Sequence, residues 1–398
     1  MLAAADQIAF DRIMVTQPVW NHFDTASNAL NLDKYTLLHA GPAFNHINEI
    51  CRPIMNSACV AAVYEGIAAD FEQAENMINT QEISLQPAQD YGVVTPLAAV
   101  VSASMPLHGV YDAHGGQVRV FAPINGGSKP SLRLGLCSHA VLEHIRWLNG
   151  PFCDVLLSGM AEGVELIPLA VGGLEQGDDC HGRTAYATQL LIAELNQRTP
   201  GGIKDSDALA FMNTSPSLFL NLWMAATKCM MQVASGIEES ALVTAAGGNG
   251  IEVGIQISGL PGHWFTDHAD PPKGKFDLDL PIDRALGAIG DSAVIDGLGL
   301  GAMAIDQSPE QLKALSANLP ENYHQRIEKL KIMIHPDFKP MNVKLGISAR
   351  QVVEMGSAPM IALGILDCRG DKGRLGGGIY DMPLLPFTNA LTTLEKHS

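Results

Sequence analysis

One short segment, residues 177–183, brings several chemically active side chains together. Two carboxylates, a thiol, an imidazole and a guanidinium stand within six consecutive positions, at Asp178, Asp179, Cys180, His181 and Arg183. Apolar residues recur at helical spacing over the residues that follow, so a helix is predicted over 184–195. Asp178 or Asp179 would then be its N-cap, with His181 and Arg183 in the first turn.

Such a helix start is a candidate anion site, because free N–H groups and the positive end of the helix dipole meet there. His181 and Asp179 are therefore candidate catalytic residues, and Arg183 is a candidate substrate-binding residue. The structural alternative is an acidic helix cap whose neighbours only solvate a turn.

Four further polar groups stand at the ends of predicted strands and helices: His39 with Gly41, Asn221 with Lys228, Asn249 with Glu252, and the glycines Gly376 and Gly377. Glycine permits close backbone approach to a ligand. Arg, Lys, Asn and backbone N–H groups together suit carboxylate, carbamoyl or phosphoryl groups. We therefore add these residues to the candidate site.

Each of these residues also has a structural interpretation. His39 would bond a local carbonyl, and Lys228 would extend out of a buried helix. Asn249 would be needed only for its two-residue turn. Glu252 would be an exposed residue on the polar face of a strand.

No cofactor or metal motif accompanies these residues. The chain has no GxxxxGK[ST], GxSxG or HExxH sequence, and its glycines at 297, 299 and 301 do not match the dinucleotide fingerprint. Seven scattered cysteines form no CxxC pair, so free thiols in a reducing compartment are expected. A metal site at His181 and the two aspartates is the less favoured interpretation, since so few ligands are not specific.

Composition limits the class of protein. The formal charge of −17 argues against nonspecific nucleic-acid binding, although a local cation cluster remains compatible with a small anionic substrate. We find neither a signal peptide nor an apolar run of membrane-spanning length. A soluble, cytoplasmic protein is expected.

Both helices and strands are predicted to position these residues. Helices are predicted over 56–78, over 138–148 with Ser138 as its N-cap, and over 217–235, the last buried on all sides. Hairpins are predicted over 105–121, turning at 112–116, and over 241–258, turning at Asn249-Gly250. A strand is expected over 97–102, and a surface loop over 267–275. The chain is divided into segments 1–34, 35–200, 201–305 and 306–398, with the clearest linker signal at 199–202.

An ordered series of these short sequences resembles the YlbE/YahG family. It comprises TLLHAGP at 36–42, YEG at 64–66, GDDCH at 177–181, FLNL at 219–222 with Lys228, NGIEVG at 249–254, IGDS at 289–292 and VEMG at 353–356 before the final glycine run. The resemblance covers roughly residues 35 to 395. This chain departs from the family's pattern at 89–92 and at Gly182, where the family usually has a histidine-rich sequence and Asn.

The resemblance implies a multi-part α+β fold with a largely helical insert. It also implies a subunit of a carbamoyltransferase, since one member belongs to oxamate carbamoyltransferase, which converts oxalurate and phosphate into oxamate and carbamoyl phosphate. The implied partners are an FdrA-like subunit of acyl-CoA-synthetase type and a further small subunit, in a homo- or hetero-oligomer.

Carbamoyl transfer suggests a role for each candidate residue. Arg183 and Lys228 would hold carboxylate and phosphate. His181, oriented by Asp178 or Asp179, would protonate the leaving nitrogen, with His39 as a second acid–base group. Asn221, Asn249 or backbone N–H groups would stabilise the oxyanion. Two alternatives are a stand-alone metal-dependent amidohydrolase acting on a small ureido or amide acid, and a noncatalytic scaffold subunit.

Overall fold

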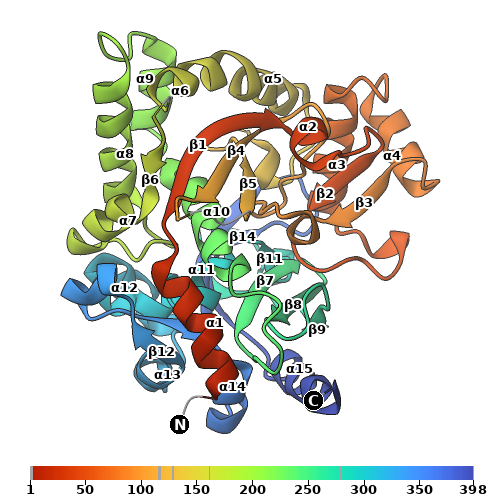
Figure 1. The fold of residues 1–398 in the computed structure, drawn as a ribbon. Coiled ribbons are helices and arrows are strands. Elements are labelled where there is room, and N and C mark those ends of the chain that lie inside the picture. Colours follow the sequence, from red (N-terminus) through yellow and green to blue (C-terminus); the bar gives the residue numbers. More distant parts are fainter. Residues whose placement is uncertain (1–2, 115–117, 128–129, 161, 278, 398) are drawn as a thin grey trace.

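The computed structural model describes residues 3–114, 118–127, 130–160, 162–277 and 279–397. They form five small sheets separated and covered by helices (Figure 1). The predicted α+β class is confirmed. In the described part of the chain, no helix combines the length and apolarity needed to cross a bilayer.

The centre of the molecule is helix α10, Leu218–Gln232, which is buried on nearly every side as predicted (Figure 1). It packs against the sheet β5-β4-β1-β6 and against α7, α8, α11 and β7. The strands of that sheet are β1 Pro18–Thr25, β4 Pro106–Asp112, β5 Arg119–Pro123 and β6 Val164–Glu165. The predicted first hairpin is thus β4–β5, while its turn residues Gly115 and Gly116 lie outside the described residues.

Two antiparallel sheets pack next to α10 and α11, through β7 and β14. One has the order β11-β7-β8-β9 and the other β10-β15-β14. Their strands are β7 Val243–Asn249, β8 Glu252–Ile257, β9 Phe265–His268, β10 Lys273–Phe276, β11 Ile289–Gly290, β14 Met360–Leu366 and β15 Arg374–Asp381. The second predicted hairpin, β7–β8, is confirmed. The predicted loop over 267–275 is wrong in part, because β9 ends and β10 begins within it.

A third region contains the parallel pair β2 Thr36–His39 and β3 Ser84–Pro87 with two helices. The single helix predicted over 56–78 is wrong. The chain forms α3 Arg52–Tyr64 and α4 Phe71–Asn79, because Gly66 turns at φ +67° and the side chain of Asp70 caps the second helix at the N–H of Gln73. Apolar spacing continues across this break and does not reveal it.

A helical stretch between β5 and α10 corresponds to the predicted insert. It contains α5 His139–Trp147, α6 Cys153–Gly159, α7 Leu166–Glu175, α8 Ala185–Arg198 and α9 Ser206–Asn213. The predicted N-cap is confirmed for α5, where the hydroxyl of Ser138 accepts from the N–H of Val141. The linker signal at 199–202 falls between α8 and α9.

The remaining elements complete the termini and the connections. They are α1 Ala4–Val15, α2 Ala26–Leu30, α11 Ala293–Leu298, α12 Pro309–Leu315, α13 Tyr323–Lys329, β12 Lys331–Ile334, β13 Lys344–Ile347, α14 Ala349–Met355 and α15 Leu385–His397. The strand predicted over 97–102 is wrong; only Val101 forms a bridge, with Leu38. One large core contains residues from Ala9 to Leu394, and the division into four segments stays a prediction.

Candidate functional site

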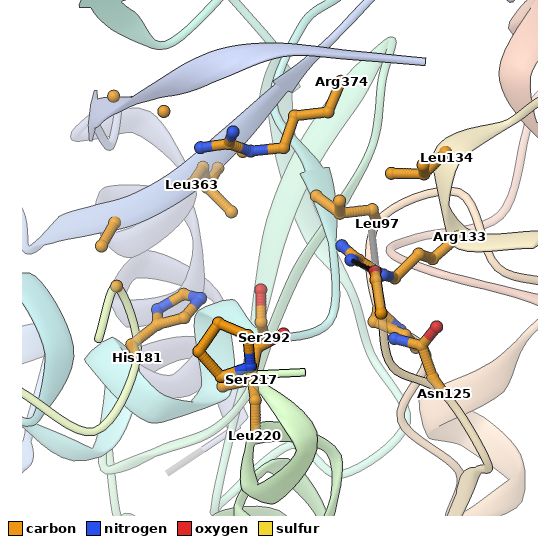
Figure 2. A pocket seen from close by; sticks show the side chains of 18 of the residues that line it. Leu97, Asn125, Arg133, Leu134, His181, Ser217, Leu220, Ser292, Leu363 and Arg374 are labelled. Atoms are coloured by element: carbon orange, nitrogen blue, oxygen red, sulfur yellow. Dashed lines mark hydrogen bonds between the residues drawn. The ribbon is translucent and has the colours of Figure 1, made fainter. Parts of the chain in front are cut away.

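A cleft of about 640 Å³ lies where the N-terminal end of α10, the strands β14 and β15 and the loop before α8 meet (Figure 2). Its polar described lining consists of Asn125, Arg133, His181, Thr214, Ser217, Ser292, Gln311, Lys372 and Arg374. Of the residues predicted for a site, His181 and Gly377 lie in this lining.

The charge of this lining is opposite to that of the chain. Arg133, Lys372 and Arg374 line the cleft, whereas none of its described lining residues is an aspartate or a glutamate. The whole chain has 42 acidic residues against 25 lysines and arginines. A cavity with cationic walls attracts and concentrates anions even when the net charge is negative. The cleft is therefore suited to a small anion.

His181 lines the cleft and is paired with an aspartate that the sequence did not indicate. The Nδ1 atom of His181 lies 2.5 Å from Oδ2 of Asp296. The other carboxylate oxygen of Asp296 accepts from the N–H groups of Ala302 and Ala362, at 2.8 and 3.2 Å. Both side chains are almost fully buried, at 5% and 0% exposure. This pairing fixes the ring through Nδ1 and leaves Nε2 for a substrate.

The pairing also changes the proton affinity of the histidine. Burial lowers the pKa of His181, but the charge and hydrogen bond of Asp296, with the charge of Asp179, outweigh burial, so the pKa is raised above 6.5. A protonated imidazole held in this way is suited to act as a general acid.

The backbone around His181 is held by Asp179. Its Oδ1 atom accepts from the N–H groups of His181 and Arg183, at 2.8 and 2.9 Å. Cys180 between them adopts the left-handed conformation at φ +67°. Burial raises the pKa of the Cys180 thiol well above 9, so its sulfur is no candidate nucleophile. Asp179 thus positions His181 through the main chain.

The predicted helix start is partly wrong. Helix α8 begins at Ala185, so His181 and Arg183 precede its first turn. The capping carboxylate is Asp178, whose Oδ2 reaches the N–H of Ala187 at 2.9 Å. Local sequence pointed to an acidic cap, but the turn held by Asp179 places His181 before the helix and beside Asp296.

Arg183 lies outside the described lining of the cleft. Its guanidinium pairs with Glu310 at 2.6 Å and lies 3.5 Å from Asp178. It also lies over the ring of Tyr186. These contacts occupy the charge that was predicted to bind substrate.

His39, Gly41, Asn249 and Glu252 gather in a different place, at the β7–β8 turn. The buried ring of His39 bonds the carbonyl of Ala40, and burial lowers its pKa to about 4. A Cβ on Gly41 would come within 2.3 Å of Gly248. Asn249 donates to Pro42 and accepts from the N–H groups of Ile251 and Glu252.

The Glu252 side chain and the Gly41 backbone are hydrogen-bonded to neighbouring strands and loops. The Glu252 carboxylate accepts from Asn45 and Thr266. The N–H of Gly41 donates to the buried Asp291. These bonds join β8 to β9 and join the loop after β2 to the segment after β11, outside the described lining of the cleft.

Asn221 and Lys228 are buried in α10. Asn221 donates to the carbonyl of Pro123, at 2.7 Å, and Lys228 donates to that of Thr244, at 2.8 Å. Burial lowers the pKa of Lys228 to about 8, opposed by the charges of Asp291 and Asp90. Each side chain ties α10 to a neighbouring strand, and neither belongs to the described lining.

Gly376 and Gly377 are interior residues of β15, whereas they were predicted at the end of a strand or helix. A Cβ on Gly376 would lie 2.1 Å from the carbonyl of Lys275 in β10. A Cβ on Gly377 would lie 2.9 Å from Nη2 of Arg374. The first glycine permits strand pairing, and the second leaves room for an arginine of the cleft.

The sequence did not indicate three residues of the cleft, Arg133, Lys372 and Arg374, nor Asp296, the partner of His181. Asp296 had a signal, because it is an isolated acid in the apolar stretch 293–305. Lys372 and Arg374 flank the first glycine of the final glycine run, whereas Arg133 carries no local signal. Among the described residues, no group of three or more His, Cys, Asp or Glu side chains is arranged to hold a metal ion.

Comparisons with known proteins identify relatives of this chain. The family model described as oxamate carbamoyltransferase subunit AllG matches residues 83–292. Oxamate carbamoyltransferase subunit AllG of Escherichia coli (strain K12) is 31% identical, over 99% of this chain and 98% of its own. The uncharacterized protein YahG of the same organism is 30% identical, over 98% and 85%.

A solved structure has the same fold. The crystal structure of a conserved protein of unknown function from Enterococcus faecalis V583 superposes with a TM-score of 0.92, at 26% identity, over 98% of this chain and 97% of that one. The resemblance predicted from the short sequences is confirmed, and the chain belongs to the family of the oxamate carbamoyltransferase subunit AllG.

Proposed function

We propose that this chain is a subunit of a carbamoyltransferase complex acting on oxalurate, oxamate or a close relative, and that the cleft beside His181 takes part in the reaction. One observation carries the proposal. The cleft has cationic walls and is lined by a histidine that is paired with a buried carboxylate. Oxalurate, oxamate, phosphate and carbamoyl phosphate are all small anions. The family relationship supports the same substrate class.

In this reaction His181 has one role, which is to donate a proton to the leaving group. A phosphate oxygen attacks the terminal ureido carbonyl carbon of oxalurate, and the bond from that carbon to the oxamate nitrogen breaks. The departing nitrogen takes a proton, which Nε2 of His181 supplies. The products are oxamate and carbamoyl phosphate, and in the reverse direction the neutral imidazole accepts the proton.

Asp296 and Asp179 serve as positioning residues in this scheme. Asp296 holds the ring and favours its charged form, and Asp179 fixes the backbone on either side of Cys180. We assign Arg183, Asn221, Lys228, His39, Gly41, Asn249, Glu252 and Gly376 to the framework, because their contacts tie elements together.

Activity is proposed to need partner subunits, one of them an FdrA-like protein of acyl-CoA-synthetase type and one a further small subunit. The assignment of this chain to the family of a named subunit supports an assembly of several chains.

The test is phosphate-dependent cleavage of oxalurate by the co-expressed complex. His181→Ala is expected to lower the rate by roughly 10²- to 10⁴-fold, the usual contribution of a general acid. His268→Ala, at a side chain 73% exposed on β9, is the control and should leave the rate unchanged.

Other outcomes would favour the alternatives. Full activity of the His181→Ala complex would indicate a scaffold subunit. Activity of this chain alone, abolished by a chelator, would indicate a metal-dependent amidohydrolase.

A further inference from the structure

Two arginines from distant parts of the sequence reach into the same cleft. Arg133 lies in a short 3₁₀ turn, Leu132–Leu134, and Arg374 is the first residue of β15. Figure 2 shows their side chains extending into the cavity from different sides, with His181 on a third side. The three groups therefore surround a common volume.

Arg133 has more hydrogen-bond donors than partners. A guanidinium carries five N–H donors. Nη2 donates to the carbonyl of Gly127 at 2.7 Å, while the buried Nε has no partner. No carboxylate in the described part of the chain pairs with it. Burial, followed by the nearby charge of Arg374, lowers its pKa to about 10. A buried charge of this kind is costly until an anion compensates it.

Arg374 lies across a pair of glycines. Gly364 of β14 and Gly377 of β15 are opposite each other in the sheet. A Cβ on Gly364 would lie 3.7 Å from Nε of Arg374, and one on Gly377 would lie 2.9 Å from its Nη2. The only carboxylate paired with Arg374 among the described residues is Asp277, which binds Nη1. The glycines thus let the guanidinium lie low over the sheet at the edge of the cleft.

We infer that Arg133 and Arg374 form a clamp for one inorganic phosphate ion, placed opposite His181. Two guanidinium charges match a phosphate dianion, and its four oxygens can accept from both planar forks. A single carboxylate, with one charge and two oxygens, is satisfied by one fork. The clamp rests on the proposed function for its part in catalysis, where it would hold the attacking phosphate across the carbamoyl group from His181.

The clamp is tested by binding, without turnover. Isothermal titration of inorganic phosphate into the isolated chain is expected to give saturable binding that Arg133→Gln and Arg374→Gln each weaken by about 10- to 100-fold, the usual loss for a charge-assisted contact. Gly377→Ala is expected to weaken it in the same direction, because the added methyl displaces Nη2 of Arg374. Circular dichroism checks that each variant is folded.

Arg146→Gln is the matched control. It removes an arginine charge at an exposed ion pair with Glu143 on α5, outside the described lining of the cleft, and is expected to leave phosphate binding within about twofold. Oxamate is titrated into the same proteins to separate carboxylate from phosphate recognition. Its affinity should change less than about threefold in Arg374→Gln, since a single carboxylate is not the clamp's ligand.

Three results would overturn the clamp: no phosphate binding by the unaltered chain, equal loss of binding in Arg146→Gln, or loss of oxamate binding with phosphate binding retained. The clamp and the proposed function can fail separately. Phosphate binding that depends on both arginines, in a complex that does not cleave oxalurate, would leave the clamp standing and reject carbamoyl transfer. If the complex is active and its arginine variants bind phosphate normally, carbamoyl transfer stands and the clamp is rejected.

Discussion

At the scale of single residues, the site depends on the pairing of His181 with Asp296. The histidine alone, buried at this depth, would lose its proton more readily, because burial lowers its pKa. The Asp296 carboxylate reverses this effect and raises the pKa of His181. Since the folded-state pKa lies above that of an exposed histidine, the ion pair stabilises the fold fully below about pH 6.5 and loses this contribution as the pH rises through the raised pKa.

The same pairing predicts a pH dependence of catalysis. If protonated His181 is the acid, the rate of oxalurate cleavage falls as the pH rises through its raised pKa. Asp296→Asn removes the charge that raises this pKa, so burial dominates and the falling limb moves to lower pH. The measurement is kcat against pH for both complexes. Superimposable profiles would show that Asp296 does not tune the group that limits the rate.

At the scale of elements, the turn before α8 and the segment after α11 must meet at close range. The N–H of Gly301 donates to the carbonyl of Asp179 at 2.8 Å. A Cβ on Gly301, which has φ +59°, would lie 2.4 Å from Oδ1 of Asp296 and 2.8 Å from Cβ of His181. The absence of a side chain at 301 is what allows the two segments to bring the pair together.

Gly301→Ala is therefore expected to lower the reaction rate more than it lowers the stability of the fold. The added methyl displaces His181 or Asp296, and a misplacement of about 1 Å costs roughly 10²-fold in rate. Gly236→Ala is the control, because Gly236 has a similar left-handed φ of +81° and an added Cβ would meet nothing within 4 Å. Both variants lose about 1–2 kcal/mol of stability from the backbone conformation. Equal activity of the two, with thermal unfolding as the check on folding, would contradict this account.

At the scale of the whole molecule, a buried histidine in the core makes the stability of the fold decrease at low pH. His108 of β4 is buried against the rings of Trp20 and Phe23, and burial lowers its pKa to about 3. The unfolded chain binds a proton at this histidine near pH 6.5, whereas the folded chain does not. The stability contributed by neutral His108 is therefore present above pH 6.5 and is lost as the pH falls toward 3.

His108→Phe should remove this contribution while keeping an aromatic ring beside Trp20. Between pH 7 and pH 5, the unaltered chain is expected to lose about 2 kcal/mol more stability than the variant, from the difference between pKa values of about 6.5 and about 3. Urea unfolding at both pH values measures the difference, and groups common to both proteins cancel. An equal loss in the two proteins would show that His108 is not held neutral.

The sequence by itself determined the features whose causes are local. The buried helix α10, the hairpins β4–β5 and β7–β8, and the Ser138 cap each depend on residues within one short window, where spacing, turn residues and caps act. The segment before α8 was also singled out by its residue types, and its His181 lines the cleft. One wrong prediction, the unbroken helix over 56–78, has a local cause, because the chain turns at Gly66 while the apolar pattern continues.

Only the tertiary structure decided which groups meet. Asp296 lies 115 positions from His181, and Arg133 and Arg374 come from opposite halves of the chain. No pattern within a window relates such residues, because their proximity results from the packing of separate sheets around α10. The same packing joined His39, Asn249 and Glu252 at a framework turn, away from the described lining of the cleft, although their residue types had suggested chemistry.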